Sequence, residues 1–99
     1  MKIYMTTLKG CNAEGEFWAT HLGTYPDKHI AIARLIVVLG EQMAFYEEKE
    51  KEEGGKTEAF NGQDFATVEW DKDGLTFEKV TLSVKEVELG KDDYSLLTY

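Results

Sequence analysis

The sequence predicts an α+β fold, a two-layer ββ-α-ββ domain in which an antiparallel sheet carries one long helix packed on one face. Two alternating segments rich in β-branched and aromatic residues come before a long segment with helical spacing, and two more such segments follow it. Short turns between strands make the sheet antiparallel, and the helix must bury its apolar stripe against it. The length of 99 residues suits one core, so we expect a single domain over residues 1–99.

The N-terminal segment predicts a β-hairpin. Lys2–Leu8 is rich in β-forming residues, and Gly10–Gly15 has the composition of a turn. Glu16–Leu22 alternates between two faces and is the predicted returning strand.

The clearest boundary is the predicted start of the helix. Thr24-Tyr25-Pro26-Asp27 offers a threonine N-cap, a proline in the first turn and an acid at the third helical position. The helix then runs to Glu53, where a Gly-Gly pair supplies a stop. Its apolar stripe ends at Tyr46, so we expect the charged run after Tyr46 to project into solvent.

One segment of this helix is ambiguous. His29–Leu39 is β-branched enough to form a buried strand, since its residues also alternate between two sets of apolar side chains. The cap signal before the segment and the helical spacing after it favour the helix.

The C-terminal half predicts a second hairpin. Lys56–Asp64 is interpreted as a polar connection, and Phe65–Trp70 and Leu75–Val84 are interpreted as paired strands. The four residues Asp-Lys-Asp-Gly between these strands are typical of a turn.

The end of the chain contains two further features. Val87 and Leu89 fall in the register opposite to that of Val84, which suggests a bulge or a new segment near Lys85. The tail Tyr94–Tyr99 is apolar, so we expect it to dock on the body of the protein or on a partner.

Charge is distributed unevenly along the chain. In residues 1–46 four acids balance four basic residues, whereas residues 47–99 hold 15 acids and 7 lysines and so carry the whole formal charge of −8. Acidic surfaces repel nucleic acid and anionic membranes and attract basic protein surfaces. The sequence therefore predicts a protein-binding function with neither nucleic acid nor membrane as a direct partner.

Cysteine and histidine provide few candidates for catalysis or zinc binding. Cys11 is the single cysteine, which excludes an internal disulfide, and with His21 and His29 it shows none of the paired short spacings that zinc requires. A nucleophilic Cys11–His21 pair is conceivable because such partners meet in space, but a hairpin tip is a poor place for a fixed oxyanion site. Nor does the chain contain a glycine-rich phosphate loop.

Asp71-Lys72-Asp73-Gly74 is the candidate for calcium binding. A calcium loop needs a third ligand before the glycine and a glutamate at the far end, and neither stands at the required spacing. A hairpin turn explains the same residues. We therefore expect no metal, no cofactor and no enzymatic activity.

Two short motifs carry a resemblance to known proteins. Leu22-Gly23-Thr24-Tyr25-Pro26-Asp27, followed by Ala31 and Ala33, and later Val84-Lys85-Glu86-Val87-Glu88-Leu89, resemble segments of small orphan proteins of phages and mobile elements. Some proteins of that kind are similar in size and acidity to inhibitors of bacterial defence systems, including anti-CRISPR proteins. The resemblance implies an inhibitory role and supplies no catalytic residues.

The leading hypothesis is a phage or mobile-element inhibitor that docks on a basic, nucleic-acid-binding surface of a host defence protein such as a CRISPR effector. Because no targeting segment is visible, we expect it to act in the cytoplasm of the host cell. The expected partner-binding residues are Glu47, Glu48, Glu50, Glu52 and Glu53 at the helix end, with Asp71, Asp73, Asp92 and Asp93 as secondary candidates.

Two alternatives remain open. In the first, the chain is a structural or self-assembling homo-oligomer that buries Ile30–Leu39 or Tyr94–Tyr99 against a second copy. In the second, it is a small enzyme, which loss of a measured activity on Cys11→Ala or His21→Ala would reveal.

Overall fold

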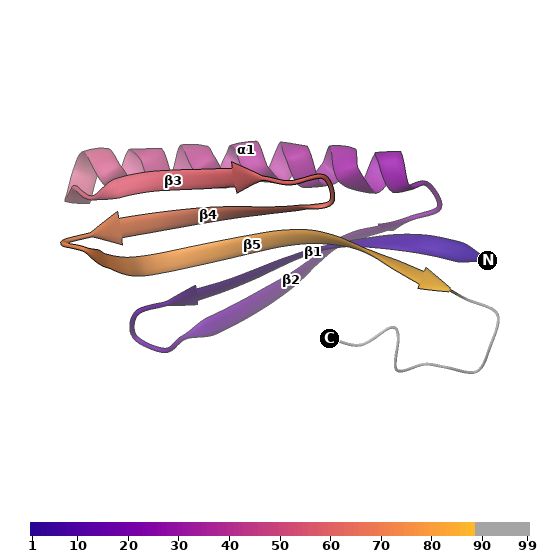
Figure 1. The fold of residues 1–99 in the computed structure, drawn as a ribbon, viewed down its shortest axis with the longest axis horizontal. Coiled ribbons are helices and arrows are strands. Elements are labelled where there is room, and N and C mark those ends of the chain that lie inside the picture. Colours follow the sequence, from indigo (N-terminus) through magenta and orange to yellow (C-terminus); the bar gives the residue numbers. More distant parts are fainter. Residues whose placement is uncertain (89–99) are drawn as a thin grey trace.

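The structure is a computed structural model that describes residues 1–88, and these residues form five strands and one helix (Figure 1). The predicted Asp92–Asp93 contact and the predicted docking of Tyr94–Tyr99 lie outside the described residues. In chain order the elements are β1 (Lys2–Asn12), β2 (Phe17–Tyr25), α1 (Lys28–Glu53), β3 (Lys56–Asn61), β4 (Phe65–Lys72) and β5 (Leu75–Glu88).

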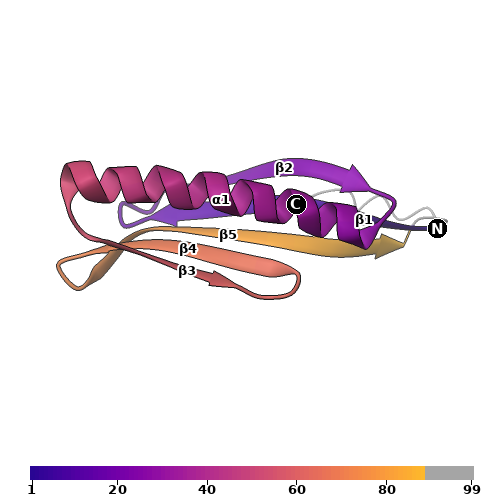
Figure 2. The ribbon, with the colours of Figure 1, turned by 90° about the horizontal axis from the view of Figure 1, so that it is seen from above.

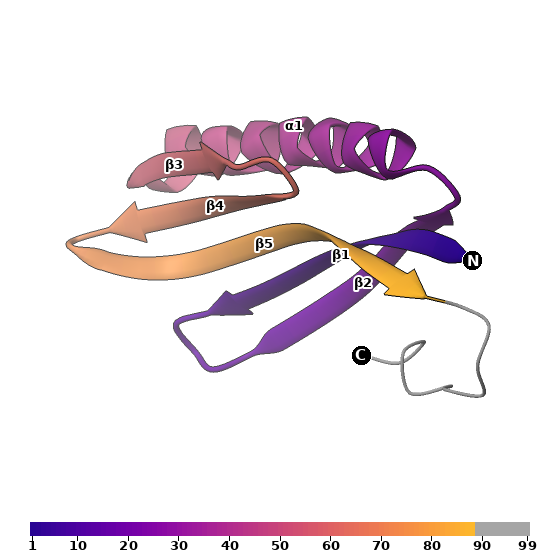
Figure 3. The same cartoon turned by 45° about the vertical axis from the view of Figure 1, so that its right-hand side comes forward.

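The strands form one sheet in the order β2-β1-β5-β4-β3, with every neighbouring pair antiparallel. α1 joins the two edge strands, β2 and β3, and covers one face of the sheet (Figure 2). The strands twist across the sheet, so that the β1–β2 hairpin runs obliquely to β3 (Figure 3). The predicted α+β two-layer fold, an antiparallel sheet with one long helix on one face, is confirmed.

The helix begins later than predicted. Tyr25 precedes a proline, which disfavours helical backbone at that position, so β2 continues through Thr24 to Tyr25. The N-cap is Asp27, whose extended backbone (φ −124°, ψ 128°) lets its carboxylate accept a hydrogen bond of 2.7 Å from His29 N. The predicted Thr24 cap is therefore wrong, whereas the predicted end at Glu53 is confirmed, with Gly54 as the C-cap at φ 82°.

Lys56–Asn61, predicted to be part of a polar connection, forms the edge strand β3. It pairs with β4 along its whole length, from Lys56 opposite Asp71 to Asn61 opposite Ala66. Its polar sequence is typical of an edge strand, which has only one neighbour and gains little from apolar side chains.

The main core lies between α1 and the sheet. Thr6 Oγ1 donates a hydrogen bond of 2.9 Å to the carbonyl oxygen of Ala31, which ties β1 to the helix within this layer. Burying a side chain of leucine size stabilises the fold by roughly 1.5–3 kcal/mol. The apolar packing of α1 on the sheet is therefore the main interaction that holds the helix. The buried core residues are Leu8, Ala31, Leu35, Val38, Leu39, Tyr46, Ala66, Val68, Trp70, Val80, Leu82 and Val84.

A second, smaller cluster consists of Ile3, Met5 and Val87. Simple alternation along β5 places Val87 on the face opposite to Val84, and β1 pairs with β5 in continuous register from Lys2–Glu88 to Asn12–Glu78. The predicted bulge near Lys85 is therefore wrong. The irregularity of β5 lies instead in its pairing with β4, between Trp70 and Asp71.

The β4–β5 connection is a tight turn. Asp73 and Gly74 both have positive φ, 54° and 79°, which matches the two-residue hairpin turn that Asp-Gly favours. Asp71 and Lys72, predicted to belong to the turn, are the last two residues of β4.

Candidate functional site: an acidic cleft at one end of the sheet

Three chain segments meet at one end of the molecule. The C-terminal end of α1, the β1–β2 turn and the β4–β5 turn all lie at the left end of Figure 1, and they remain together in the other two views. Residues of these segments line a cleft of about 480 Å³. Its charged side chains are Glu14, Glu16, Glu53, Asp73 and Glu78 against Lys49 and Lys72.

Glu78 of β5 lines the cleft on the side of α1 and contacts two residues of that helix. Its carboxylate pairs with the ammonium group of Lys49 and accepts a hydrogen bond of 3.4 Å from the hydroxyl of Tyr46. Burial, and then the negative charge of Glu78, raise the pKa of Tyr46 to about 12. The tyrosine therefore stays a neutral donor at physiological pH.

The floor of the cleft is aromatic. The indole Nε1 of Trp70 donates a hydrogen bond of 3.0 Å to the carbonyl oxygen of Gly54, which satisfies one of the free carbonyl groups at the helix end. Phe77 packs beside Trp70 with 5.6 Å between ring centroids, and the Lys49 ammonium lies 4.8 Å from the centroid of the Trp70 ring. Trp70 is buried and Phe77 is partly exposed, so Phe77 presents the more accessible ring to the cleft.

The β1–β2 turn supplies two acids that sequence reasoning missed. Asn12 Oδ1 accepts hydrogen bonds of 3.0 Å from the backbone N–H groups of both Glu14 and Glu16, which shapes the turn. Ala13 N donates a hydrogen bond of 2.8 Å to the carbonyl oxygen of Phe77, which anchors the turn to β5. The sequence signal was present in Asn-Ala-Glu-Gly-Glu, but these acids lie in the half of the chain whose net charge is zero.

The structure brings together only part of the predicted acidic set. Glu53 and Asp73 line the cleft, and Glu47, Glu48 and Glu52 are exposed on the last turns of α1. Glu50 is half-buried, and its carboxylate accepts a hydrogen bond of 3.0 Å from the backbone of β3.

The predicted projection of the helix end into solvent is wrong. Lys49, Glu50 and Tyr46 all contact the sheet, because β3, β4 and β5 extend beneath the last turns of α1.

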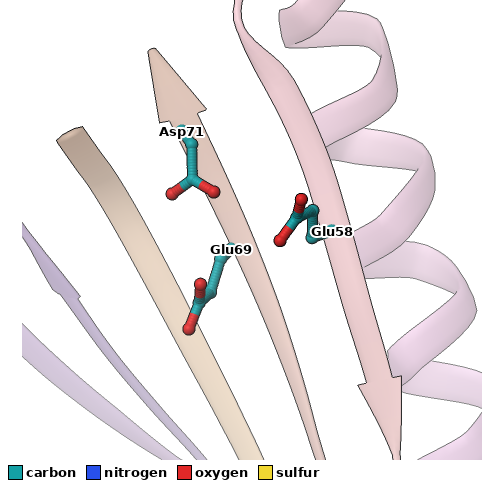
Figure 4. Close-up of side chains that lie close together, drawn as sticks. All are labelled: Glu58, Glu69 and Asp71. Atoms are coloured by element: carbon teal, nitrogen blue, oxygen red, sulfur yellow. The ribbon is translucent and has the colours of Figure 1, made fainter. Parts of the chain in front are cut away.

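Asp71 lies away from the cleft, in a second acidic cluster on β3 and β4 with Glu58 and Glu69 (Figure 4). One carboxylate oxygen from each of these residues lies within 4.8 Å of the others. Lys56 lies 3.7 Å from Glu58 and Lys79 lies 3.4 Å from Glu69, so lysines already pair with two of the three. A calcium ion takes six to eight oxygen ligands, and one oxygen from each of these three side chains supplies three of them. The sequence signal for this cluster was hidden, because Glu58 and Glu69 become cross-strand neighbours only through the unpredicted strand β3.

Cys11 and His21, the nucleophilic pair considered from the sequence, lie apart in the structure. Cys11 lies opposite Phe17 in the β1–β2 ladder, whereas His21 lies opposite Thr7, four residues further along β1. Four residues of a strand span about 13 Å, too far for a hydrogen bond between thiol and imidazole. His21 Nε2 instead lies 2.9 Å from the hydroxyl of Thr24.

The length and apolar composition of α1 also suit a membrane span. By these two criteria alone the helix is long and apolar enough to cross a bilayer, and 28% of the apolar window is buried inside the fold. The core helix of a two-layer fold meets the same criteria, and α1 contributes five buried side chains to the core.

The carboxylates of the cleft accept hydrogen bonds and attract cations. Comparisons with protein-family models, with curated proteins and with solved structures found no match.

Proposed function

We propose that the chain is a non-enzymatic binding protein whose acidic end docks on a basic surface of another protein. The observation that supports this proposal is the meeting of three acidic segments around one cleft. Five carboxylates and two lysines line it, for a formal charge of −3. A concave site of one sign of charge concentrates its field, which accelerates encounter with an oppositely charged partner.

The lining of the cleft favours an arginine or lysine side chain as the central contact of the partner. Phe77 offers an aromatic surface on which a guanidinium group can stack, and Glu14 and Asp73 lie in the turns that flank it. The hydrogen bonds of Asn12 hold Glu14 and Glu16 in a fixed turn. Such pre-ordering lowers the entropic cost of binding.

The most concrete form of the proposal follows from the resemblance to phage and mobile-element proteins. In that form the protein acts in the host cytoplasm and inhibits a defence protein such as a CRISPR effector. Its carboxylates occupy positions in a basic groove where the phosphates of nucleic acid would otherwise bind. Exposed acids on the last turns of α1 extend the negative surface beyond the cleft.

Charge reversal with a matched control tests the proposal. The cleft variant Glu14→Lys/Asp73→Lys and the control variant Glu41→Lys/Glu88→Lys change the net charge equally, and all four residues are exposed. We expect the affinity for a fluorescent oligo-arginine peptide to fall at least about tenfold in the cleft variant and to change little in the control. Binding of the wild-type chain should also weaken as salt rises.

A capture experiment from a host lysate then tests the class of partner. The immobilised wild-type chain should retain basic nucleic-acid-binding proteins, and added duplex DNA should compete with it for them. Equal loss of peptide binding in both variants, or capture that neither salt nor DNA affects, would contradict the proposal.

A further inference from the structure

We infer that two copies of this chain associate through the outward face of α1, with the two helices antiparallel about a two-fold axis near Gly40. The inference concerns a different surface from the acidic cleft and does not depend on the proposed function.

The side of α1 that faces away from the sheet is apolar. Ile30, Ile36 and Val37 are exposed by 50%, 52% and 53% of their surfaces. The opposite side of the same helix contributes five buried residues to the core. A helix that is apolar on both sides is normally covered on both sides, and the described residues cover only one.

The centre of the exposed face is a glycine. Gly40 lies between Ile36 and Ala44 on the outward side, and a Cβ atom placed on it would meet no atom within 4 Å. Neither a positive φ nor a close contact among the described residues requires glycine there, although glycine weakens a helix relative to alanine. With Ala33 and Ala44 it forms a row of small residues that allows a second helix backbone to approach closely.

The distribution of charge along α1 favours a second copy of the chain as the partner, and it favours an antiparallel orientation of the two helices. Residues 28–39 hold Lys28 and Arg34 and no acid, for a charge of +2. Residues 40–53 hold six glutamates and two lysines, for a charge of −4. Antiparallel packing places each positive half beside a negative half and also opposes the two helix dipoles, whereas parallel packing places the two negative halves together.

Arg34 identifies the register. This residue, the single arginine of the chain, is half-buried, and no carboxylate among residues 1–88 forms an ion pair with it. With the axis between Gly40 and Glu41, the helix position opposite Arg34 is occupied by Glu47 of the second copy, and Glu48 is the next residue along. Glu48 lies on the same flank of the helix as Arg34, and among residues 1–88 its ion pair is a loose, exposed contact with Lys51 at 4.0 Å.

A lipid bilayer is another surface that an apolar helix face can meet. The six glutamates in the second half of α1 and the net charge of −8 oppose contact with anionic lipid. Self-association, by contrast, uses the same glutamates as partners for Arg34 and Lys28. The antiparallel dimer would carry its two acidic clefts at opposite ends, at least the helix length of about 39 Å apart.

Sedimentation equilibrium of the full chain, from about 1 to about 200 μM, tests the inference. We expect a monomer–dimer equilibrium in the wild-type chain. Gly40→Leu should weaken it at least about tenfold by blocking the close approach, with unchanged circular dichroism. Glu88→Lys, at the far end of the sheet, is the control and should leave the equilibrium unchanged.

A charge swap provides the more specific test. Arg34→Glu and Glu48→Arg should each weaken the dimer at least about fivefold, and the double variant should restore it to within about threefold of the wild type. Restoration distinguishes contact between copies from an effect on the fold of one chain.

Three results would overturn the inference: a monomer at every concentration, a dimer that Gly40→Leu leaves intact, or a double variant no better than the single ones. Flotation of the monomer with phosphatidylcholine vesicles would assign the face to a bilayer instead. Because Gly40 is remote from the cleft, Gly40→Leu should bind the oligo-arginine peptide normally, so failure of the dimer and failure of the proposed function are distinguishable.

Discussion

Lys49 of α1 and Glu78 of β5, which are 29 residues apart in the sequence, form an ion pair between the helix and the sheet. The ammonium group also lies over the Trp70 ring, and Glu78 accepts the hydrogen bond of the Tyr46 hydroxyl. A single carboxylate thus joins the two helical residues to β5. These contacts hold the last turns of α1 against the sheet and form one wall of the acidic cleft.

Removing Glu78 should destabilise the fold more than removing Lys49. Glu78→Gln leaves the partly buried ammonium group of Lys49 without its counter-ion, and we expect a loss of about 1–3 kcal/mol in the free energy of unfolding. Lys49→Met keeps the alkyl packing over Trp70 and leaves Glu78 its tyrosine donor, so we expect a loss of about 1 kcal/mol. Urea denaturation of both variants and of the double variant measures the coupling, and simple additivity would contradict the paired arrangement.

Because the pKa of Tyr46 is raised in the folded chain, we expect the protein to lose stability at alkaline pH. The pKa of this tyrosine is about 12 in the folded chain against about 10 in the unfolded chain, so the unfolded chain loses the proton first. The stabilising contribution is complete below about pH 10 and disappears as the pH rises through about 12, a change of up to about 3 kcal/mol. Urea midpoints across this range measure it, and the slope should be smaller in Tyr46→Phe. An equal slope in both proteins would show that other groups cause the alkaline loss.

Features that depend on neighbouring residues could be predicted from the sequence. The stop after Glu53, the Asp73-Gly74 turn and the helical stripe that contains Leu35 are all local signals. Features that depend on distant pairing could not. Ala13 reaches Phe77 only because β1 lies beside β5, which is how Glu14 joins the cleft.

The Gly54–Gly55 pair predicts unequal effects of the same substitution. Both residues have positive φ, 82° and 87°, so alanine is strained at either position. Gly54, with ψ −165°, lies in a region that essentially only glycine adopts, where the strain is about 1–3 kcal/mol. A Cβ at Gly54 meets open space, whereas a Cβ at Gly55 would lie 2.6 Å from the carbonyl oxygen of Asp71 and 2.8 Å from Trp70 Nε1. We therefore expect Gly54→Ala to cost about 1–3 kcal/mol, from backbone strain alone, and Gly55→Ala about 2–5 kcal/mol, from strain and overpacking together, in denaturant unfolding. Equal losses would show that the contact between Gly55 and β4 does not constrain this junction.

Replacing Glu58, which lies opposite Glu69, should stabilise the protein. The two glutamates are directly opposite each other on β3 and β4, and like charges in that relationship repel. Glu58→Thr removes the repulsion and supplies a β-branched residue, so we expect the free energy of unfolding to rise by about 0.5 kcal/mol. Lys56 loses an exposed partner at 3.7 Å, which costs little because such surface pairs are weak. Thermal unfolding of Glu58→Thr beside the control Glu52→Thr, which lies on the exposed helix end, measures the difference. A lower melting temperature in Glu58→Thr would show instead that the carboxylate of Glu58 stabilises this cluster.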